Sequence, residues 1–266
     1  MQKSARLEKL FFLSNKLFMP FLVIGDPDFE TCLALSEGLI RGGADLLEFG
    51  IPFSDPPADG PVIQAADQRA LLAGMNTDRA FEFLKRVRSK TEAPIALLLY
   101  YNLVFRYGVE EFYRRASEAG VDAVLIADLP VEEAHSALAA AKKYGIAPIF
   151  IVSELTSQDR LDKILEKAQG YLYLVTRLGI TGQQKEVSGN LYEVIERLKK
   201  RSDLRVFAGF GLSQPEQVRE VLRLGADGAI CGSAIVGRIE KNLGDIPAMV
   251  GAVEAFCREM KAATIP

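Results

Sequence analysis

The stretch GADLLEFGIPFSDPPADGP, residues 43–61, contains in order a helix-ending glycine, a short apolar strand and an acidic, proline-rich loop. Gly43 suits the left-handed conformation that ends many helices, and Asp45 opens the strand that follows. The same glycine-to-aspartate junction recurs at residues 120–122 and 225–227. Repetition of this junction indicates a chain in which helices alternate with strands.

Eight short apolar runs are candidate strands. They are rich in Val, Ile, Leu and aromatic residues and lack strict polar alternation, which is typical of strands covered on both faces. The first follows a basic start but runs into Asp26-Pro27, a helix-start signature, so we interpret it as a buried strand and not as a signal peptide. The runs are residues 19–24, 45–49, 95–100, 122–127, 147–152, 171–176, 205–209 and 227–232.

Amphipathic helices are expected between these strands. Apolar residues follow the i, i+3, i+4, i+7 spacing over residues 161–168 and 191–198. Eight strand–helix units with no linker rich in Pro, Gly or Ser predict one (β/α)8 TIM barrel, with additional N-terminal and C-terminal helices. We therefore expect residues 1–266 to form a single domain. A doubly wound open sheet is the alternative.

The composition is that of an ordinary globular chain. Of 266 residues, 49% are hydrophobic, and the 32 basic and 35 acidic residues leave a net charge of −3, which predicts neither nucleic-acid nor membrane binding. The three cysteines form no CxxC pair and there is one histidine, so no metal or haem site is expected. Sparse cysteines and the lack of a membrane-spanning apolar run lead us to expect a cytoplasmic protein.

Glu48 is the first candidate for chemistry. In a barrel the active site lies at the carboxyl ends of the strands, and Glu48 falls there in the second strand. By the two-residue period of a strand, Leu47 and Phe49 face the helices and Glu48 faces the mouth of the barrel. A carboxyl group in an apolar mouth has a raised pKa and can donate a proton. A solvated glutamate or an ion-pair partner is the alternative.

Asp55 and Asp59 lie in the loop after this strand. Prolines stiffen that loop by fixing their φ angles, and a stiff acidic loop is suited to positioning a catalytic group. Ordinary turn chemistry, with each Asp bonded to its own backbone, is the alternative, and a rigid docking surface is another.

Three glycine turns follow the last three expected strands, at residues 179–182, 209–211 and 231–234. The loops after strands seven and eight of a barrel often bind phosphate through backbone N–H groups, and Ser233 is expected to cap a short helix there. The long polar segment 176–190 is expected to be either a closing lid or an ordinary surface loop.

Four aromatic residues fall near the carboxyl ends of different strands. Core packing is the simplest explanation for each of them. Together they would form a flat apolar slot for an aromatic substrate. They are Phe21, Tyr100, Tyr173 and Phe210.

With these residues assembled, the sequence resembles the α subunit of the tryptophan synthase family over nearly its whole length. The most specific block is LEFGIPFSDPPADGPVIQ, residues 47–64. Further matches are residues 101–108, 120–133, 178–182, 209–218 and 231–236.

The resemblance implies retro-aldol cleavage of indole-3-glycerol phosphate to indole and glyceraldehyde 3-phosphate. It implies that Glu48 is the acid and base at indole C3, that Asp59 accepts the indole N–H, and that Thr181 closes onto Asp59. The implied substrate-binding residues are Phe21, Leu98, Tyr100, Tyr173, Thr181 and Phe210. The implied phosphate-binding residues are Gly182, Gly211, Gly232 and Ser233.

The resemblance also implies a partner, a β subunit that carries pyridoxal phosphate, receives indole through a tunnel and forms an α2β2 assembly. Pro52 and Asp55 fall at the implied partner interface, and no cofactor is expected in this chain. Two other functions stay open. The first is a subunit whose main role is to activate its partner, which the unusual Pro56-Pro57 pair favours. The second is another phosphate-binding barrel enzyme, because the glycine turns are compatible with other phosphate-containing substrates.

Overall fold

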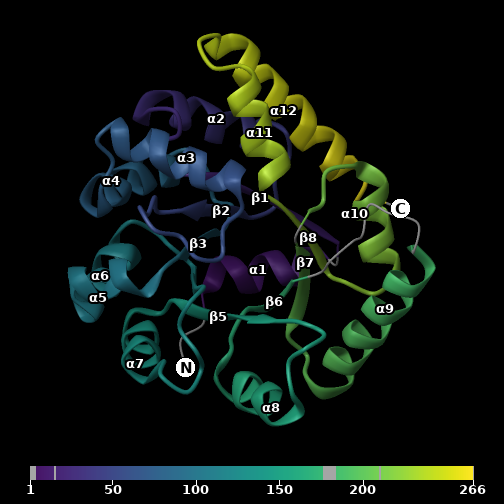
Figure 1. The fold of residues 1–266 in the computed structure, drawn as a ribbon. Helices are drawn as coiled ribbons and strands as arrows, with labels where there is room; N and C mark the ends of the chain where they lie inside the picture. Colours follow the sequence, from purple (N-terminus) through teal and green to yellow (C-terminus); the bar gives the residue numbers. More distant parts are fainter. Residues whose placement is uncertain (1–3, 15, 176–183, 210, 266) are drawn as a thin grey trace.

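Eight parallel strands form a closed barrel in the computed structural model, which describes residues 4–14, 16–175, 184–209 and 211–265 (Figure 1). Each strand pairs with the next along the chain, and β8 pairs with β1 to close the ring. The strands are β1 Leu17–Val23, β2 Leu47–Gly50, β3 Ile95–Leu99, β4 Ala123–Ile126, β5 Ala147–Val152, β6 Tyr171–Val175, β7 Arg205–Gly209 and β8 Gly228–Cys231.

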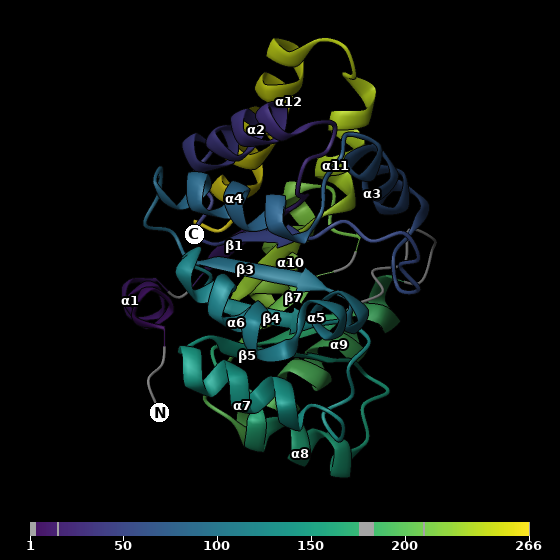
Figure 2. The ribbon, with the colours of Figure 1, turned by 90° about the vertical axis from the view of Figure 1, so that its left-hand side faces the viewer.

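Helices surround this barrel, except α1, which lies across its middle in the view of Figure 1. The helices are α1 Ala5–Leu13, α2 Phe29–Arg41, α3 Pro61–Leu72, α4 Thr77–Arg88, α5 Tyr101–Tyr107, α6 Val109–Glu118, α7 His135–Tyr144, α8 Gln158–Lys167, α9 Gln184–Arg201, α10 Pro215–Arg223, α11 Ser233–Lys241 and α12 Ile246–Ala262. Figure 2 shows α1 at one end of the barrel, beside the tails of the strand arrows. The loops at the opposite end, where the strands finish, are therefore the ones available for a site.

The barrel confirms the predicted fold class, and α1 and α12 are the additional terminal helices. All eight expected runs overlap a strand, although β1 begins and ends earlier than residues 19–24 and β2 ends at Gly50, one residue after the run 45–49. The open sheet is excluded because residues 17–20 of β1 pair with residues 228–231 of β8. That residues 1–266 act as one domain stays a prediction.

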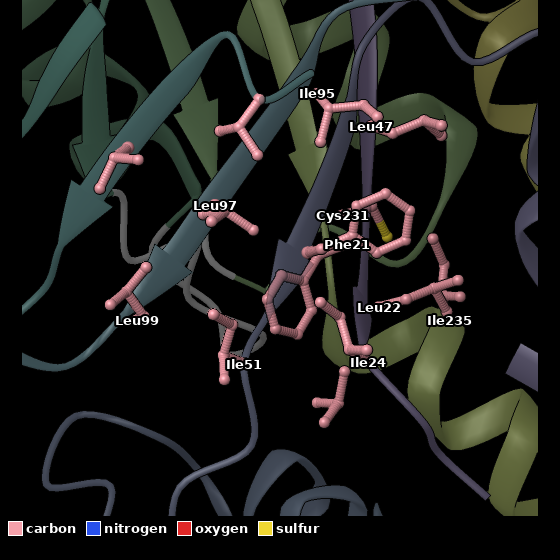
Figure 3. Packing of buried hydrophobic residues seen from close by; sticks show 14 of the residues in the cluster. Phe21, Leu22, Ile24, Leu47, Ile51, Ile95, Leu97, Leu99, Cys231 and Ile235 are labelled. Atoms are coloured by element: carbon pink, nitrogen blue, oxygen red, sulfur yellow. The ribbon is translucent and has the colours of Figure 1, made fainter. Parts of the chain in front are cut away.

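Two apolar cores hold the structure together. The inner core fills the barrel and includes Leu17, Leu46 and Tyr171, with Leu7 of α1 packed under it. The outer core lies between the strands and the helices, where Figure 3 shows side chains of β1, β2 and β3 packed with Ile235 of α11. In β4 and β6, alternate residues pack in alternate cores, so these strands are apolar on both faces.

The three glycine-to-aspartate junctions lie at the amino ends of strands. Their glycines have φ values between 78° and 106°, as expected of left-handed helix ends. Each aspartate accepts a backbone N–H from the first or second residue of the strand before its own: Asp45 from Phe18 at 2.7 Å, Asp122 from Ile95 at 2.9 Å and Asp227 from Val206 at 2.8 Å. A charged acceptor for a buried N–H fixes the start of each strand.

One local expectation is corrected. Asp26-Pro27 does not begin a helix; α2 begins at Phe29, and Asp28 caps it by accepting the N–H of Thr31 at 2.9 Å. Asp26 is instead fully buried and forms a two-bond ion pair with Arg69 of α3. The Asp26-Pro27 pair therefore does not mark the start of α2, because Asp28, two residues after Asp26, is the cap.

None of the described helices is long and apolar enough to span a bilayer.

Asp122 provides a test of this scaffold. It is 3% exposed and binds Ser4 Oγ at 2.6 Å and an Arg88 Nη at 3.1 Å besides the Ile95 N–H. Asp122→Ala should lower the free energy of unfolding by about 3 kcal/mol, because a buried N–H and a guanidinium lose their partner. Urea unfolding measures this, with exposed Asp203→Asn as the control. A loss below about 1 kcal/mol would contradict the assignment.

Candidate active site

Glu48 is buried inside the carboxyl end of β2. Its side chain comes from the strand position that alternates with Leu47 and Phe49, both of which pack in the outer core, as the sequence predicts. The residue is 1% exposed, and neither carboxylate oxygen has a hydrogen-bond partner among the described residues. Burial raises the pKa of Glu48 to about 8. The group therefore holds a proton at neutral pH, and the alternatives of a solvated glutamate and an ion-pair partner are wrong.

Two tyrosines of β6 lie near Glu48. Burial raises the pKa of Tyr171 and of Tyr173 well above the usual range, and the negative charge of Glu48 adds to both shifts. Tyr171 points into the inner core, where its ring lies 4.6 Å from that of Phe207. Tyr173 lies further along the strand, toward the carboxyl end. The carboxyl group of Glu48 thus has an aromatic and largely apolar environment.

Asp59 lies in the loop between β2 and α3 and is only partly buried. The hydroxyl of Tyr100 donates to its Oδ2 at 2.7 Å, and the N–H of Ala58 donates to the same hydroxyl oxygen at 3.2 Å. Burial raises the pKa of Asp59, and the bond from Tyr100 opposes that rise. Gln64 of α3 also donates to the backbone oxygen of Asp59, at 2.7 Å. Side chains of two neighbouring elements therefore hold Asp59, and within its own turn the Asp59 N–H donates to the Pro56 oxygen at 3.4 Å.

Glu48 and Asp59 both lie close enough to Tyr173 to affect its pKa. The charge of each carboxylate raises the pKa of this one phenol, so its hydroxyl lies within electrostatic reach of both. The environments of the two acids differ, since within the described part of the chain Glu48 lacks a hydrogen-bond partner and Asp59 has a phenol donor. Paired carboxyl groups in unlike environments can hold different protonation states at one pH. Two acids in unlike environments therefore lie at the carboxyl end of the barrel.

Phe21 forms an apolar wall beside Glu48. The two residues are partners in the register of β1 and β2, and Gly50 pairs with Leu98 of β3. The Phe21 ring occupies the space next to Gly50, where an added Cβ would lie 2.8 Å from its Cζ. Phe21, Leu98 and Tyr100 thus come together at the carboxyl ends of β1 to β3. Phe210 lies outside the described residues.

The predicted phosphate-binding residues are only partly described. Gly232 adjoins the aromatic wall, since an added Cβ there would lie 3.4 Å from Cδ1 of Phe21. Gly211 follows β7 with φ of 78°, a conformation that favours glycine. Thr181 and Gly182, and the 176–183 part of the predicted lid, lie outside the described residues.

The role predicted for Ser233 as a helix cap is wrong. Gly232 takes the cap position of α11, Ser233 is the first helical residue, and no side chain caps this helix. The Gly232 oxygen instead accepts the N–H of Ile235 at 2.8 Å. The N–H groups of Ser233 and Ala234, at the amino end of α11, thus lie at the glycine turn after β8.

Of the two residues predicted at the partner interface, both in the acidic loop, one is exposed and the other is buried. Asp55 is exposed and accepts a hydrogen bond from the hydroxyl of Ser54. Pro52 is buried. Asp55 can therefore meet another molecule directly, whereas Pro52 acts on the shape of the loop.

Sequence reasoning missed two residues next to these acids. The ring of Phe53 lies 5.4 Å from that of Tyr100, and Asp67 of α3 is only 5% exposed. The signal for Asp67 was present: it falls with Ile63, Ala66 and Ala70 on the buried face of α3. An acid on the apolar face of a helix is unusual enough to mark a functional neighbourhood.

Among the described residues, no three His, Cys, Asp or Glu side chains gather in a way that could hold a metal ion.

A sequence profile of the tryptophan synthase alpha chain family matches residues 8–265. The chain belongs to the tryptophan synthase alpha chain family. It is 48% identical over 259 residues to the tryptophan synthase alpha chain of Methanoregula boonei, covering 97% of this chain and 98% of that one. It is 51% identical over 246 residues to that of Methanothermobacter thermautotrophicus, covering 92% and 91%.

Solved structures agree with this membership. The tryptophan synthase subunit alpha of Legionella pneumophila superposes with a TM-score of 0.88 at 35% identity, covering 97% of this chain and 96% of that one. A chain from the tryptophan synthase a2b2 complex of Pyrococcus furiosus does so with a TM-score of 0.85 at 35% identity, covering 92% and 98%. Membership in the tryptophan synthase alpha chain family implies a lyase-type enzyme.

The burial of Glu48 predicts a pH-dependent stability. Its pKa is about 8 in the fold against 4.5 ordinarily, so its contribution to stability is fully present below pH 4.5 and is lost as the pH rises through 8. Glu48→Gln cannot ionise, and it should be more stable than the wild type by a few kcal/mol at about pH 8.5 and similar to it at about pH 4.5.

Urea unfolding at the two pH values measures this difference, with the exposed Glu82→Gln of α4 as the matched control. An equal stability difference at both pH values for Glu48→Gln would contradict the buried, protonated state.

Proposed function

We propose that this chain is the α subunit of a tryptophan synthase and cleaves indole-3-glycerol phosphate to indole and glyceraldehyde 3-phosphate. The proposal rests on family membership and, above all, on one observation: a buried carboxyl group without a hydrogen-bond partner, with a pKa of about 8, near a second carboxylate held by a phenol. A retro-aldol cleavage of this substrate needs a proton donor, which would be Glu48, and a nearby anion, which would be Asp59.

The first step is protonation of the indole ring. The carboxylic acid of Glu48 donates its proton to C3, which becomes tetrahedral and leaves a positive charge shared with the ring nitrogen. Asp59, as a carboxylate, accepts the indole N–H and stabilises that charge. An apolar surrounding keeps the proton on Glu48 until the substrate takes it, and the phenol of Tyr100 favours the ionised form of Asp59.

The second step breaks the bond between C3 and the side-chain carbon. The Glu48 carboxylate removes the proton of the adjacent hydroxyl group, whose oxygen forms the aldehyde C=O. The electron pair of the broken bond returns to the indole ring and neutralises its charge. Glu48 ends with the proton count with which it began, so the cycle is balanced without a cofactor in this chain.

The other proposed roles follow from the shape of the substrate. The flat indole ring would lie against Phe21 and Leu98, with Tyr100, Tyr173 and Phe210 beside it. The phosphate would bind backbone N–H groups at Gly211, Gly232 and Ser233 together with Gly182, while Thr181 would close onto Asp59. The amino end of α11, whose first-turn N–H groups lack a side-chain cap, supports this half of the proposal.

A β subunit that carries pyridoxal phosphate is the proposed partner, in a cytoplasmic α2β2 assembly. The exposed carboxylate of Asp55, on the same loop as Asp59, supports a docking role next to the active site. The a2b2 complex of the Pyrococcus furiosus relative supports the same assembly.

Incubation of the purified chain with indole-3-glycerol phosphate tests the reaction. Indole release should occur, and Glu48→Gln should lower kcat by at least about a thousandfold while the substrate still binds, because the proton donor is lost. Adding the β subunit should raise the wild-type rate. Enhancement of the partner's chemistry without cleavage at any ratio would instead favour the partner-activating function, and a Glu48→Gln variant with most of its turnover would refute the role of this group.

The docking role of Asp55 has its own test. Asp55→Lys reverses an exposed charge outside the two acids' immediate contacts, so it should weaken binding of the β subunit by about tenfold or more. Cleavage by the isolated chain should change less than about twofold. Titration of a labelled β subunit measures the affinity, and unchanged affinity would mean that Asp55 lies outside the interface.

A further inference from the structure

Two of the proposed phosphate-binding turns are joined by a side-chain hydrogen bond. Gly211 and Leu212 follow β7, and Gly232 follows Cys231, the last residue of β8. The thiol of Cys231 donates to the backbone oxygen of Leu212, with the Sγ and O atoms 2.9 Å apart. Both residues are buried and pack in the outer core, where Figure 3 shows Cys231. The bond therefore links the two turns in a place that water does not reach.

This bond continues a connection that the two strands begin. Gly209 and Ile230 are the last partners in the register of β7 and β8. Cys231 follows Ile230 directly, and on its other side it pairs with Pro20 of β1. The thiol thus reaches from the end of β8 to the turn after β7, beyond the backbone pairing of these two strands.

Gln217 of α10 holds the other side of the same peptide group. Its Oε1 accepts the N–H of Ser213 at 2.7 Å and that of Gln214 at 3.0 Å. The Leu212 oxygen and the Ser213 N–H belong to one planar peptide unit. That unit is therefore bound at both ends, by a thiol from β8 and by a side-chain amide from α10.

The turn next to this peptide unit has a backbone that needs to be fixed. Gly211 has φ of 78°, and glycine exchanges this conformation for others at little cost. Apart from its neighbours in the chain, no described residue lies within 4 Å of the place where a Gly211 Cβ would be. Side-chain packing at Gly211 therefore does not hold the turn within the described part of the chain. The peptide unit that follows Gly211 sets its orientation instead.

The turn after β8 is held by contacts of its own. The Gly232 oxygen accepts the N–H groups of Ile235 at 2.8 Å and of Val236 at 3.1 Å, and the Phe21 ring lies next to Gly232. Backbone N–H groups bind a phosphate group well only where they converge on it. The turn after β7 must therefore keep a fixed distance from the turn after β8. Cys231, directly before Gly232, is in the right place to set that distance.

We propose that Cys231 and Gln217 are positioning residues for phosphate binding. By holding the peptide unit between Leu212 and Ser213, they keep the Gly211 turn at the distance and orientation from the turn after β8 that a phosphate group requires. This inference rests on the proposed phosphate site, and neither side chain is among the proposed ligand contacts. Loss of either one should weaken binding of the phosphate group and leave the chemistry at the indole ring unchanged.

A comparison of two substrates in the full chain tests the inference. One is indole-3-glycerol phosphate, and the other is indole-3-glycerol, which lacks the phosphate. Cys231→Ala and Gln217→Leu each remove one of the two bonds, so each should raise KM for the phosphate ester about fivefold or more, with kcat changed less than about twofold. The kcat/KM for indole-3-glycerol should change less than about twofold. Cys231→Ser keeps a donor and should return KM to within about twofold of the wild type.

Cys257 of α12 provides the matched control. Its thiol is also buried and donates to a backbone oxygen, that of Leu39, at 3.4 Å. Cys257→Ala removes the same kind of bond and leaves the glycine turns intact. It should lower the unfolding temperature about as much as Cys231→Ala does, while KM for each substrate stays within about twofold of the wild type. The pair of variants thus separates a loss of stability from a loss of positioning.

The outcomes separate the two proposals. If the wild type favours the phosphate ester but Cys231→Ala and Gln217→Leu keep the wild-type KM, or lose equally toward both substrates, the positioning role is wrong and the proposed function stands. If the wild type cleaves both substrates with the same KM, the proposed phosphate site is wrong, and the positioning role fails with it. If the wild type releases no indole from either substrate, the proposed function and the positioning role are both wrong.

Discussion

The burial of an unpaired carboxyl group at the carboxyl end of β2 is the constraint on which the site depends. A glutamate without a hydrogen-bond partner is a cost to the fold, and a barrel with a large apolar core can carry that cost. Protonation removes the charge but leaves a proton poised for transfer near neutral pH. The same burial that destabilises ionised Glu48 thereby prepares it as an acid.

The two ends of the barrel use carboxylates in opposite ways. At the amino ends of the strands, Asp45, Asp122 and Asp227 are paired with backbone N–H groups and with basic side chains, so they secure the register of the strands. At the carboxyl ends, Glu48 has no hydrogen-bond partner among the residues that the structure describes, and Asp59 accepts a hydrogen bond from the phenol of Tyr100. Carboxylates that have several hydrogen-bond and ion-pair partners stabilise the fold, whereas carboxyl groups with few partners remain available for reaction.

The sequence predicted the barrel, its eight strands and the inward direction of Glu48, because strand periodicity and glycine-to-aspartate junctions are local signals. It failed where the outcome depended on competition between neighbours: Asp28, and not Asp26, caps α2, and Gly232 takes the cap position expected for Ser233. It also missed Phe53, whose ring packs on that of Tyr100 through a contact between distant segments that no local pattern encodes, and Asp67, although its helical spacing with the buried residues of α3 was a usable signal. The phosphate-binding and partner-interface residues remain predictions.

A direct titration of Glu48 tests the central claim. Carbon-13 labelling of the glutamate carboxyl groups, with the Glu48 resonance assigned by its loss in Glu48→Gln, gives the pKa of this one group by NMR. The structure predicts a midpoint near 8 in the free protein. A midpoint near the ordinary value of 4.5 would mean that the group is solvated or paired, and the account of a buried proton donor would be wrong.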